Sequence, residues 1–135
     1  MKRVLFVCVH NAGRSQMAEA FLRRLGADVA IAESAGTEGG ATLNPMVVEA
    51  MAEVGYDMSG HTPKLLTPEM AQAADRVITM GCGVDAESCP ALRMECEDWG
   101  LDDPKGRPIE EVRRIRDEVR ARVEQLVEEL RRCDG

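Results

Sequence analysis

A chain of 135 residues has room for one compact domain, so residues 1–135 are expected to form a single folding unit. Its net charge of −7 and its aromatic content of 3% exclude the basic, base-stacking surface that a nucleic-acid partner would need. No apolar segment is long enough to span a membrane, and the first apolar run ends at His10, too early for a secretion signal.

The apolar pattern alternates between short buried strands and longer amphipathic helices. Residues 3–8 form an uninterrupted apolar run, typical of a strand buried on both faces. Such alternation indicates an α/β fold: a single three-layer domain in which a four-stranded parallel sheet has helices on both faces. Strands are expected at residues 3–8, 28–34 and 76–80, with a short fourth near 96–99, and helices at 15–25, 45–54, 68–74 and 108–131.

The five cysteines are expected in a reducing compartment, because nothing in the sequence predicts secretion. We therefore expect a cytoplasmic protein whose cysteines are catalytic, metal-bound or inert rather than structurally bridged. A zinc site is disfavoured because the chain has no closely spaced cysteine pair. No metal site is expected, and Cys96 and Cys133 have no predicted role. The five are Cys8, Cys82, Cys89, Cys96 and Cys133.

Residues 8–15 connect the first predicted strand to the first predicted helix. A short loop at this position turns backbone N–H groups inward and forms a nest for a tetrahedral anion. Arg14 can add a bidentate fork, and the positive surroundings favour the thiolate of Cys8, to which Ser15 can donate a hydrogen bond. The alternative interpretation is an inert Cys8 beside a solvated Arg14. The position of the two residues between a strand and a helix favours the anion-binding interpretation over this one. The expected oxyanion-binding residues are Cys8, Val9, His10, Asn11, Ala12, Gly13, Arg14 and Ser15.

The run of residues 4–20, with its Cys-x5-Arg-Ser-Gln-Met-Ala-Glu-Ala pattern, resembles the low-molecular-weight tyrosine phosphatase superfamily, and more closely its arsenate reductase branch. Further similar segments are residues 34–37, 44–45, 77–80 and 99–104, so the resemblance covers nearly the whole chain. It implies a low-molecular-weight phosphatase-like domain over residues 1–135. It also implies that Cys8 is the nucleophile and that Asp103, which precedes Pro104, protonates a leaving oxygen.

Hydrolysis and arsenate reduction share these groups, so other residues must discriminate between them. The phosphatases usually follow the Asp-Pro pair with aromatic residues, whereas Lys105-Gly106-Arg107 follows here, which counts against a phosphotyrosine pocket. The thioredoxin-coupled reductases carry a cysteine pair with the separation of Cys82 and Cys89.

The resemblance therefore implies reduction of arsenate to arsenite for arsenic detoxification. Cys8 attacks arsenate, Cys82 and then Cys89 take over the disulfide by exchange, and thioredoxin reduces the redox-active Cys82–Cys89 pair. Phosphate and sulfate are expected to compete with arsenate. The alternatives are coupling to mycothiol and glutaredoxin, or phosphatase activity. A further alternative is that Cys82 and Cys89 are packing residues without a catalytic role.

Some relatives bind potassium beside the loop, with residues that match Asn11, Glu19, Ser34 and Thr62. Their acidic fifth ligand corresponds to Lys64, whose ammonium would pair with Glu19 in place of the metal. The resemblance therefore implies that this chain needs no cofactor and no potassium. Asn11 would either steady the loop through its side chain or occupy a left-handed turn.

Overall fold

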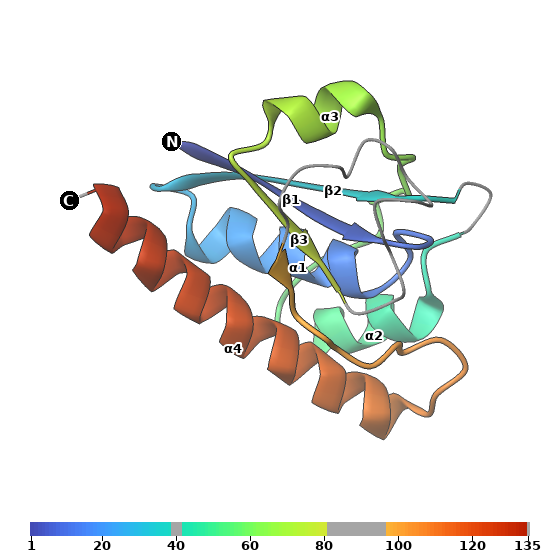
Figure 1. Cartoon of the computed structure of the whole chain (residues 1–135). Coiled ribbons are helices and arrows are strands. Elements are labelled where there is room, and N and C mark those ends of the chain that lie inside the picture. The colour runs from blue at the N-terminus through green and yellow to red at the C-terminus, as the bar shows by residue number, and fades with distance from the viewer. Residues whose placement is uncertain (39–41, 81–96, 135) are drawn as a thin grey trace.

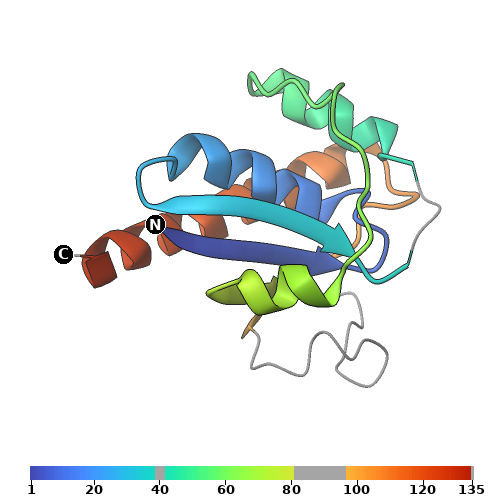
Figure 2. The ribbon, with the colours of Figure 1, turned by 90° about the horizontal axis from the view of Figure 1, so that it is seen from above.

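The structure, a computed structural model, describes residues 1–38, 42–80 and 97–134. Four parallel strands form one sheet in the order β2-β1-β3-β4. The helix α3 lies over one face of the sheet, and α1, α2 and α4 lie over the other (Figures 1 and 2). The predicted three-layer α/β fold is therefore confirmed. The elements are β1 (Lys2–Cys8), α1 (Arg14–Leu25), β2 (Ala30–Gly36), α2 (Pro45–Glu53), α3 (Pro68–Ala73), β3 (Arg76–Thr79), β4 (Glu97–Asp98) and α4 (Ile109–Asp134).

The central strand β1 is buried on both faces, as its uninterrupted apolar sequence predicts. Val4 and Phe6 belong to the larger core beneath α1, α2 and α4, whereas Leu5 and Val7 belong to a smaller core on the α3 side. On the larger side the ring of Trp99 packs against Phe6, with 5.5 Å between the ring centroids. Every helix in the described part of the chain is too short or too polar to cross a bilayer.

The second strand differs from the prediction by two residues, because β2 covers Ala30–Gly36 instead of 28–34. Val29 and Ala30 both donate their backbone N–H to the Gly26 carbonyl, so residues 27–29 form a turn before the strand begins. At its other end β2 extends to Gly36, whose N–H donates to the Lys64 carbonyl at 2.7 Å. The strand therefore begins later and ends later than its apolar pattern predicts.

The first helix begins at Arg14, one residue before the predicted start, with Gly13 at the N-cap position. No side chain caps α1, because glycine has none at the N-cap, and the Ser15 hydroxyl faces the Cys8 sulfur. The carboxyl ends of β1 and β3 meet at this point. The chain leaves β1 toward β2 on one side, and β3 lies on the other, so this is the topological switch point where parallel α/β sheets bind ligands.

Candidate active site

Cys8 is the last residue of β1, and its sulfur lies at the base of the loop that leads to α1. The Asn11 backbone N–H donates a hydrogen bond to Cys8 Sγ at 3.1 Å, and Ser15 Oγ lies 2.9 Å from the same sulfur. Cys8 is only 4% exposed, so these contacts are shielded from water. Hydrogen bonds to the sulfur, together with the N-terminus of α1, stabilise the thiolate, which is the nucleophilic form of cysteine.

Asn11 holds the loop in shape in two ways. Its backbone is left-handed, with a φ of 55°, which asparagine tolerates better than most residues. Its buried side chain accepts hydrogen bonds at Oδ1 from the Lys64 backbone N–H and from Gln16 Nε2, both at 2.9 Å, and its Nδ2 donates to Ser15 Oγ at 2.7 Å. Both interpretations of Asn11 therefore apply: it makes the turn and its side chain steadies the loop.

The end of β2 clamps the loop from outside. Thr37 donates its N–H to the Cys8 carbonyl at 3.1 Å, and Glu38 donates to the Val9 carbonyl at 2.8 Å. A Cβ atom on Gly36 would lie 2.7 Å from the Val9 carbonyl oxygen, which no side chain could tolerate without a shift of the backbone. The loop is thus fixed between the end of β2 and the start of α1.

Arg14 is almost fully buried and links three segments at the site. Its Nη1 donates to the Met80 carbonyl at 3.0 Å and to the Leu101 carbonyl at 2.6 Å, and its Nη2 lies 3.6 Å from Asp103 Oδ2. Because Nη1 serves these carbonyls, the edge formed by Nε and Nη2 is the one suited to a bidentate anion contact. The guanidinium therefore combines a structural role with the predicted anion-binding chemistry.

Asp103 lies on the rim of the same site and is more than half exposed. Its Oδ1 accepts a hydrogen bond from the Lys105 backbone N–H at 3.0 Å, which orients the carboxyl group. The preceding Asp102 pairs with Arg114 of α4 at 3.0 Å. The segment that carries Asp103 is thus held by Arg14 on one side and by α4 on the other.

The predicted nucleophile, arginine and acid surround one open pocket of about 540 Å³, which is larger than a tetrahedral oxyanion requires. Among the described residues that line it, none is Phe, Tyr or Trp. Asn11 and Ser15, both predicted as oxyanion-binding, lie fully buried behind the loop instead of lining the pocket. The lining residues are Cys8, Val9, His10, Ala12, Gly13, Arg14, Thr42, Asn44, Pro45, Asp103, Pro104, Lys105 and Gly106.

The remaining predicted site residues, Cys82 and Cys89, lie outside the described residues, as does Cys96. The sequence pattern predicts neither Thr42 nor Asn44 at the pocket, nor the contacts of Gln16 behind the loop. Gln16 could have been suspected, because it is a polar residue beside the apolar positions of the first helix. No local feature of the sequence indicates Thr42.

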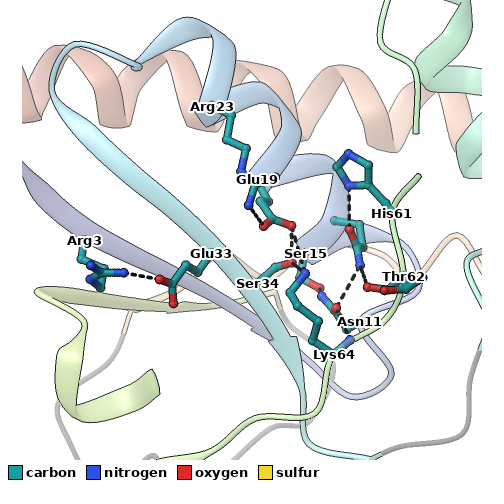
Figure 3. Close-up of polar contacts among 11 residues, drawn as sticks. Arg3, Asn11, Ser15, Glu19, Arg23, Glu33, Ser34, His61, Thr62 and Lys64 are labelled. Atoms are coloured by element: carbon teal, nitrogen blue, oxygen red, sulfur yellow. Dashed lines mark hydrogen bonds and ion pairs between the residues drawn. The ribbon is translucent and has the colours of Figure 1, made fainter. Parts of the chain in front are cut away.

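Behind the loop, Glu19 of α1 is buried and ion-paired (Figure 3). Its Oε1 lies 2.8 Å from Arg23 Nη2, and its Oε2 lies 3.4 Å from Lys64 Nζ and accepts a hydrogen bond from Ser34 Oγ at 2.7 Å. Lys64 thus has the contact with Glu19 that the resemblance predicts. Within the part of the chain that the structure describes, no cluster of three His, Cys, Asp or Glu side chains is suited to a metal ion.

The chain belongs to the low molecular weight phosphotyrosine protein phosphatase family, whose sequence model matches residues 3–134. Within that family it is similar to an arsenate reductase of Staphylococcus aureus (strain Newman). The two are 39% identical over 125 residues, which are 91% of this chain and 94% of that protein. The resemblance to the arsenate reductase branch is therefore confirmed.

Solved structures agree with the sequence comparison. An arsenate reductase in the phosphate binding state is 40% identical, with a TM-score of 0.85 over 96% of this chain and 99% of that one. A thioredoxin-dependent arsenate reductase of Corynebacterium glutamicum is 36% identical, with a TM-score of 0.77 over 97% of this chain and 62% of that one.

Proposed function

We propose that this chain is an arsenate reductase that works by a cysteine relay. The observation that carries the proposal is the pocket at the end of β1, where Cys8, Arg14 and Asp103 meet. The similarity to proteins named arsenate reductase, at 39–40% identity, supports arsenate as the oxyanion. Phosphate and sulfate have the same tetrahedral shape and are expected to compete for the loop.

In the first step, arsenate docks in the loop and the Cys8 thiolate attacks arsenic. A sulfur–arsenic bond forms, and one arsenate oxygen leaves as water with the help of a proton from Asp103. Arsenic keeps its +5 oxidation state at this stage. The fork of Arg14 and the backbone N–H groups of the loop hold the remaining oxygens.

In the second step, the Cys82 thiolate attacks Cys8 Sγ. The sulfur–arsenic bond breaks with its electron pair staying on arsenic, so arsenite leaves and a Cys8–Cys82 disulfide forms. Cys89 then attacks Cys82 Sγ and releases the Cys8 thiolate, which leaves a Cys82–Cys89 disulfide. A dithiol protein of the thioredoxin type reduces this pair. The name of the thioredoxin-dependent relative supports thioredoxin over a mycothiol–glutaredoxin system.

The test is arsenate-dependent oxidation of NADPH, with thioredoxin and its reductase compared with mycothiol and glutaredoxin. Cys82→Ser should abolish turnover in either mixture, and Cys89→Ser should permit one turnover but not a second. Cys133→Ser, outside the proposed relay, is the matched control and should behave as the native protein. Absence of arsenate-dependent oxidation in both mixtures would contradict the proposal.

Phosphatase activity is the second candidate, because the family match and the Cys8, Arg14 and Asp103 set suit it equally well. The same Cys82→Ser variant separates the two functions, since hydrolysis of a phosphoester needs no second cysteine. Full phosphatase activity in a protein that never reduces arsenate would favour this alternative.

We also propose that potassium is not required. The Lys64 ammonium lies 3.4 Å from both Glu19 Oε2 and Ser34 Oγ, where, together with Arg23, it supplies positive charge to buried Glu19. Equal turnover in potassium and sodium salts is the expected result. A strong increase in turnover with potassium over sodium would contradict it.

A further inference from the structure

Two consecutive aspartates lie at the site, and both are close to its cationic side chains. Asp103 lines the main pocket, and both Asp102 and Asp103 line a second hollow of about 320 Å³ beside it. Arg14 and Lys105 line the same hollow. Both aspartate side chains are more than half exposed, so burial does not distinguish them. Another contact must therefore determine which carboxyl group the site uses.

The backbone around the two aspartates is held on both sides. Before the pair, the Leu101 carbonyl accepts a hydrogen bond from Arg14 at 2.6 Å, and the Leu101 N–H donates to the Met80 carbonyl at 3.2 Å. After the pair, the Arg107 N–H donates to the carbonyl of buried Pro104 at 3.1 Å. Because the backbone is held, the orientation of the two side chains determines which carboxyl group lies beside a bound anion.

The two side chains have different partners. Asp103 Oδ1 accepts a hydrogen bond from the Lys105 N–H at 3.0 Å, and its Oδ2 lies 3.6 Å from Arg14 Nη2. Asp102 Oδ2 accepts a hydrogen bond from Arg114 Nη2 of α4 at 3.0 Å. Asp103 is thus bound to groups of the site, whereas Asp102 is bound to α4.

Arg114 is itself held in place on the surface of α4. Its Nη1 donates to Glu118 Oε1 at 2.7 Å, and its Nε and Nη2 donate to Glu111 Oε2 at 3.1 Å and 2.8 Å. One guanidinium therefore neutralises part of the charge of three carboxylates, of which Asp102 is one. Without it, the two glutamates would repel Asp102 from α4, and the cationic side chains of the hollow would attract it.

We propose that Arg114 is a positioning residue for the anion site, because it binds Asp102 and keeps that negative charge away from the oxyanion. A free Asp102 carboxylate would compete with the oxyanion for Arg14 and repel it. Asp103 carries a proton when the oxyanion docks in the proposed mechanism, so it adds no such charge. The net charge of −7 already disfavours anion binding, which makes one more negative charge at the pocket costly.

This inference rests on the proposed docking of an oxyanion at Cys8, but not on the reduction of arsenate. The test measures how much inorganic phosphate protects Cys8 from alkylation by iodoacetamide, at neutral pH and low ionic strength. Mass spectrometry of the peptide that contains Cys8 gives the extent of alkylation. Arg114→Met should require about fivefold more phosphate for half protection, because Asp102 is then free to approach the pocket.

The matched control is Arg113→Met, which removes the same charge from α4 and an ion pair with Glu53 of α2. It should need as much phosphate as the native protein. Adding Asp102→Asn to Arg114→Met should restore native protection, since the amide carries no charge. Adding Glu118→Gln to Arg114→Met restores the net charge equally but leaves Asp102 free, so this double variant should remain weak.

Salt separates a charge effect from a distortion of the site. In about 1 M sodium chloride, screening limits charge interactions to about 3 Å, and the difference between Arg114→Met and the native protein should disappear. Native protection in Arg114→Met at low salt, or a weakening that neither salt nor Asp102→Asn removes, would overturn the proposal.

The protection assay needs no turnover, so it also separates this inference from the proposed function. A failed reductase assay with the expected pattern of protection would contradict arsenate reduction only. Absence of protection by phosphate in the native protein would contradict oxyanion docking at Cys8, and this inference with it.

Discussion

At the scale of single residues, the site depends on which groups the two terminal nitrogens of Arg14 contact. Nη1 holds the carbonyls of Met80 and Leu101, so the guanidinium fixes the end of β3 and the segment that carries Asp103. Nη2 lies between that framework and the acid, 3.6 Å from Asp103 Oδ2. The residue proposed to bind the oxyanion is therefore also in contact with the proposed acid.

Arg14→Lys should impair both roles, because lysine offers a point charge without the planar fork. We expect a large rise in the KM for arsenate, a fall in kcat and a lower unfolding temperature. Protection of Cys8 from alkylation by phosphate measures anion affinity independently of turnover. Arg122→Lys, at an exposed position of α4, is the control. Unchanged protection by phosphate in Arg14→Lys would show that the fork does not bind the anion.

Asp103→Asn keeps the shape of the side chain but removes its acidic proton. We expect kcat to fall by about a hundredfold or more, the usual effect of losing a general acid. Inhibition by phosphate should change little, because the carboxyl group lies on the rim and the loop is intact. Steady-state kinetics with phosphate as inhibitor measure both quantities. A kcat within about twofold of the native value would exclude Asp103 as the proton donor.

At the scale of elements, the site is a loop held between two rigid neighbours. The end of β2 contacts the loop so closely that Gly36 has no room for a side chain, whereas the helix α1 takes over the chain at Arg14. Strand, loop and helix are consecutive in sequence, but the clamp comes from residues more than twenty positions later. The loop geometry is thus a property of the β1–β2 pair.

Gly36→Ala should therefore damage both stability and the site. Its Cβ would lie within 2.9 Å of backbone atoms of Val9, His10 and Asn11, which cannot move aside as flexible side chains can. We expect a loss of about 1–3 kcal/mol in the free energy of unfolding, together with slower Cys8 alkylation. Gly60→Ala meets no atom within 4 Å and is the control. Chemical denaturation followed by circular dichroism compares the stabilities of the two variants. Equal stabilities would contradict the close contact between Gly36 and the loop.

At the scale of the whole molecule, the long helix α4 forms ion pairs with separate parts of the chain. Arg113 and Arg116 pair with Glu53 of α2, and Arg114 pairs with Asp102 in the segment next to the site. Hydrogen bonds from Arg113 lower the pKa of Glu53 below its ordinary value. Burial raises this pKa, but by less than the hydrogen bonds lower it. These pairs lie at the surface, so each should add little to stability.

The lowered pKa of Glu53 gives a testable pH dependence. A carboxyl group with a depressed pKa in the folded state stabilises the fold above its unfolded pKa, and loses that effect as pH falls through the folded pKa. Glu53→Gln should thus be less stable than the native protein near pH 7, and the difference should shrink as pH falls below the ordinary pKa of a glutamate. Glu124→Gln, on the exposed side of α4, is the control. A stability difference that persists at low pH would contradict the ion-pair explanation.

Much of the fold and part of the site follow from local sequence. The apolar run of β1, the stripe of α4 and the Cys8–Arg14 spacing are each local patterns. Strand ends and buried polar contacts depend on distant partners instead. The Lys64 carbonyl sets where β2 ends, and Asn11 meets Lys64 and Gln16 only in the folded chain. Local patterns therefore predict the candidate reactive residues and the contact of Ser15 with Cys8, but not the contacts that distant segments make with the loop.

The packing of the Trp99 ring against Phe6 has a practical consequence. Trp99 is the chain's only tryptophan, and it lies two residues from Leu101, whose carbonyl Arg14 holds. We therefore expect a shift of Arg14 to disturb the backbone beside an indole ring that packs on β1. The emission of the native protein should therefore change when phosphate is titrated in, and less so in Arg14→Lys. Tryptophan fluorescence would then measure anion binding at the site without an attached label.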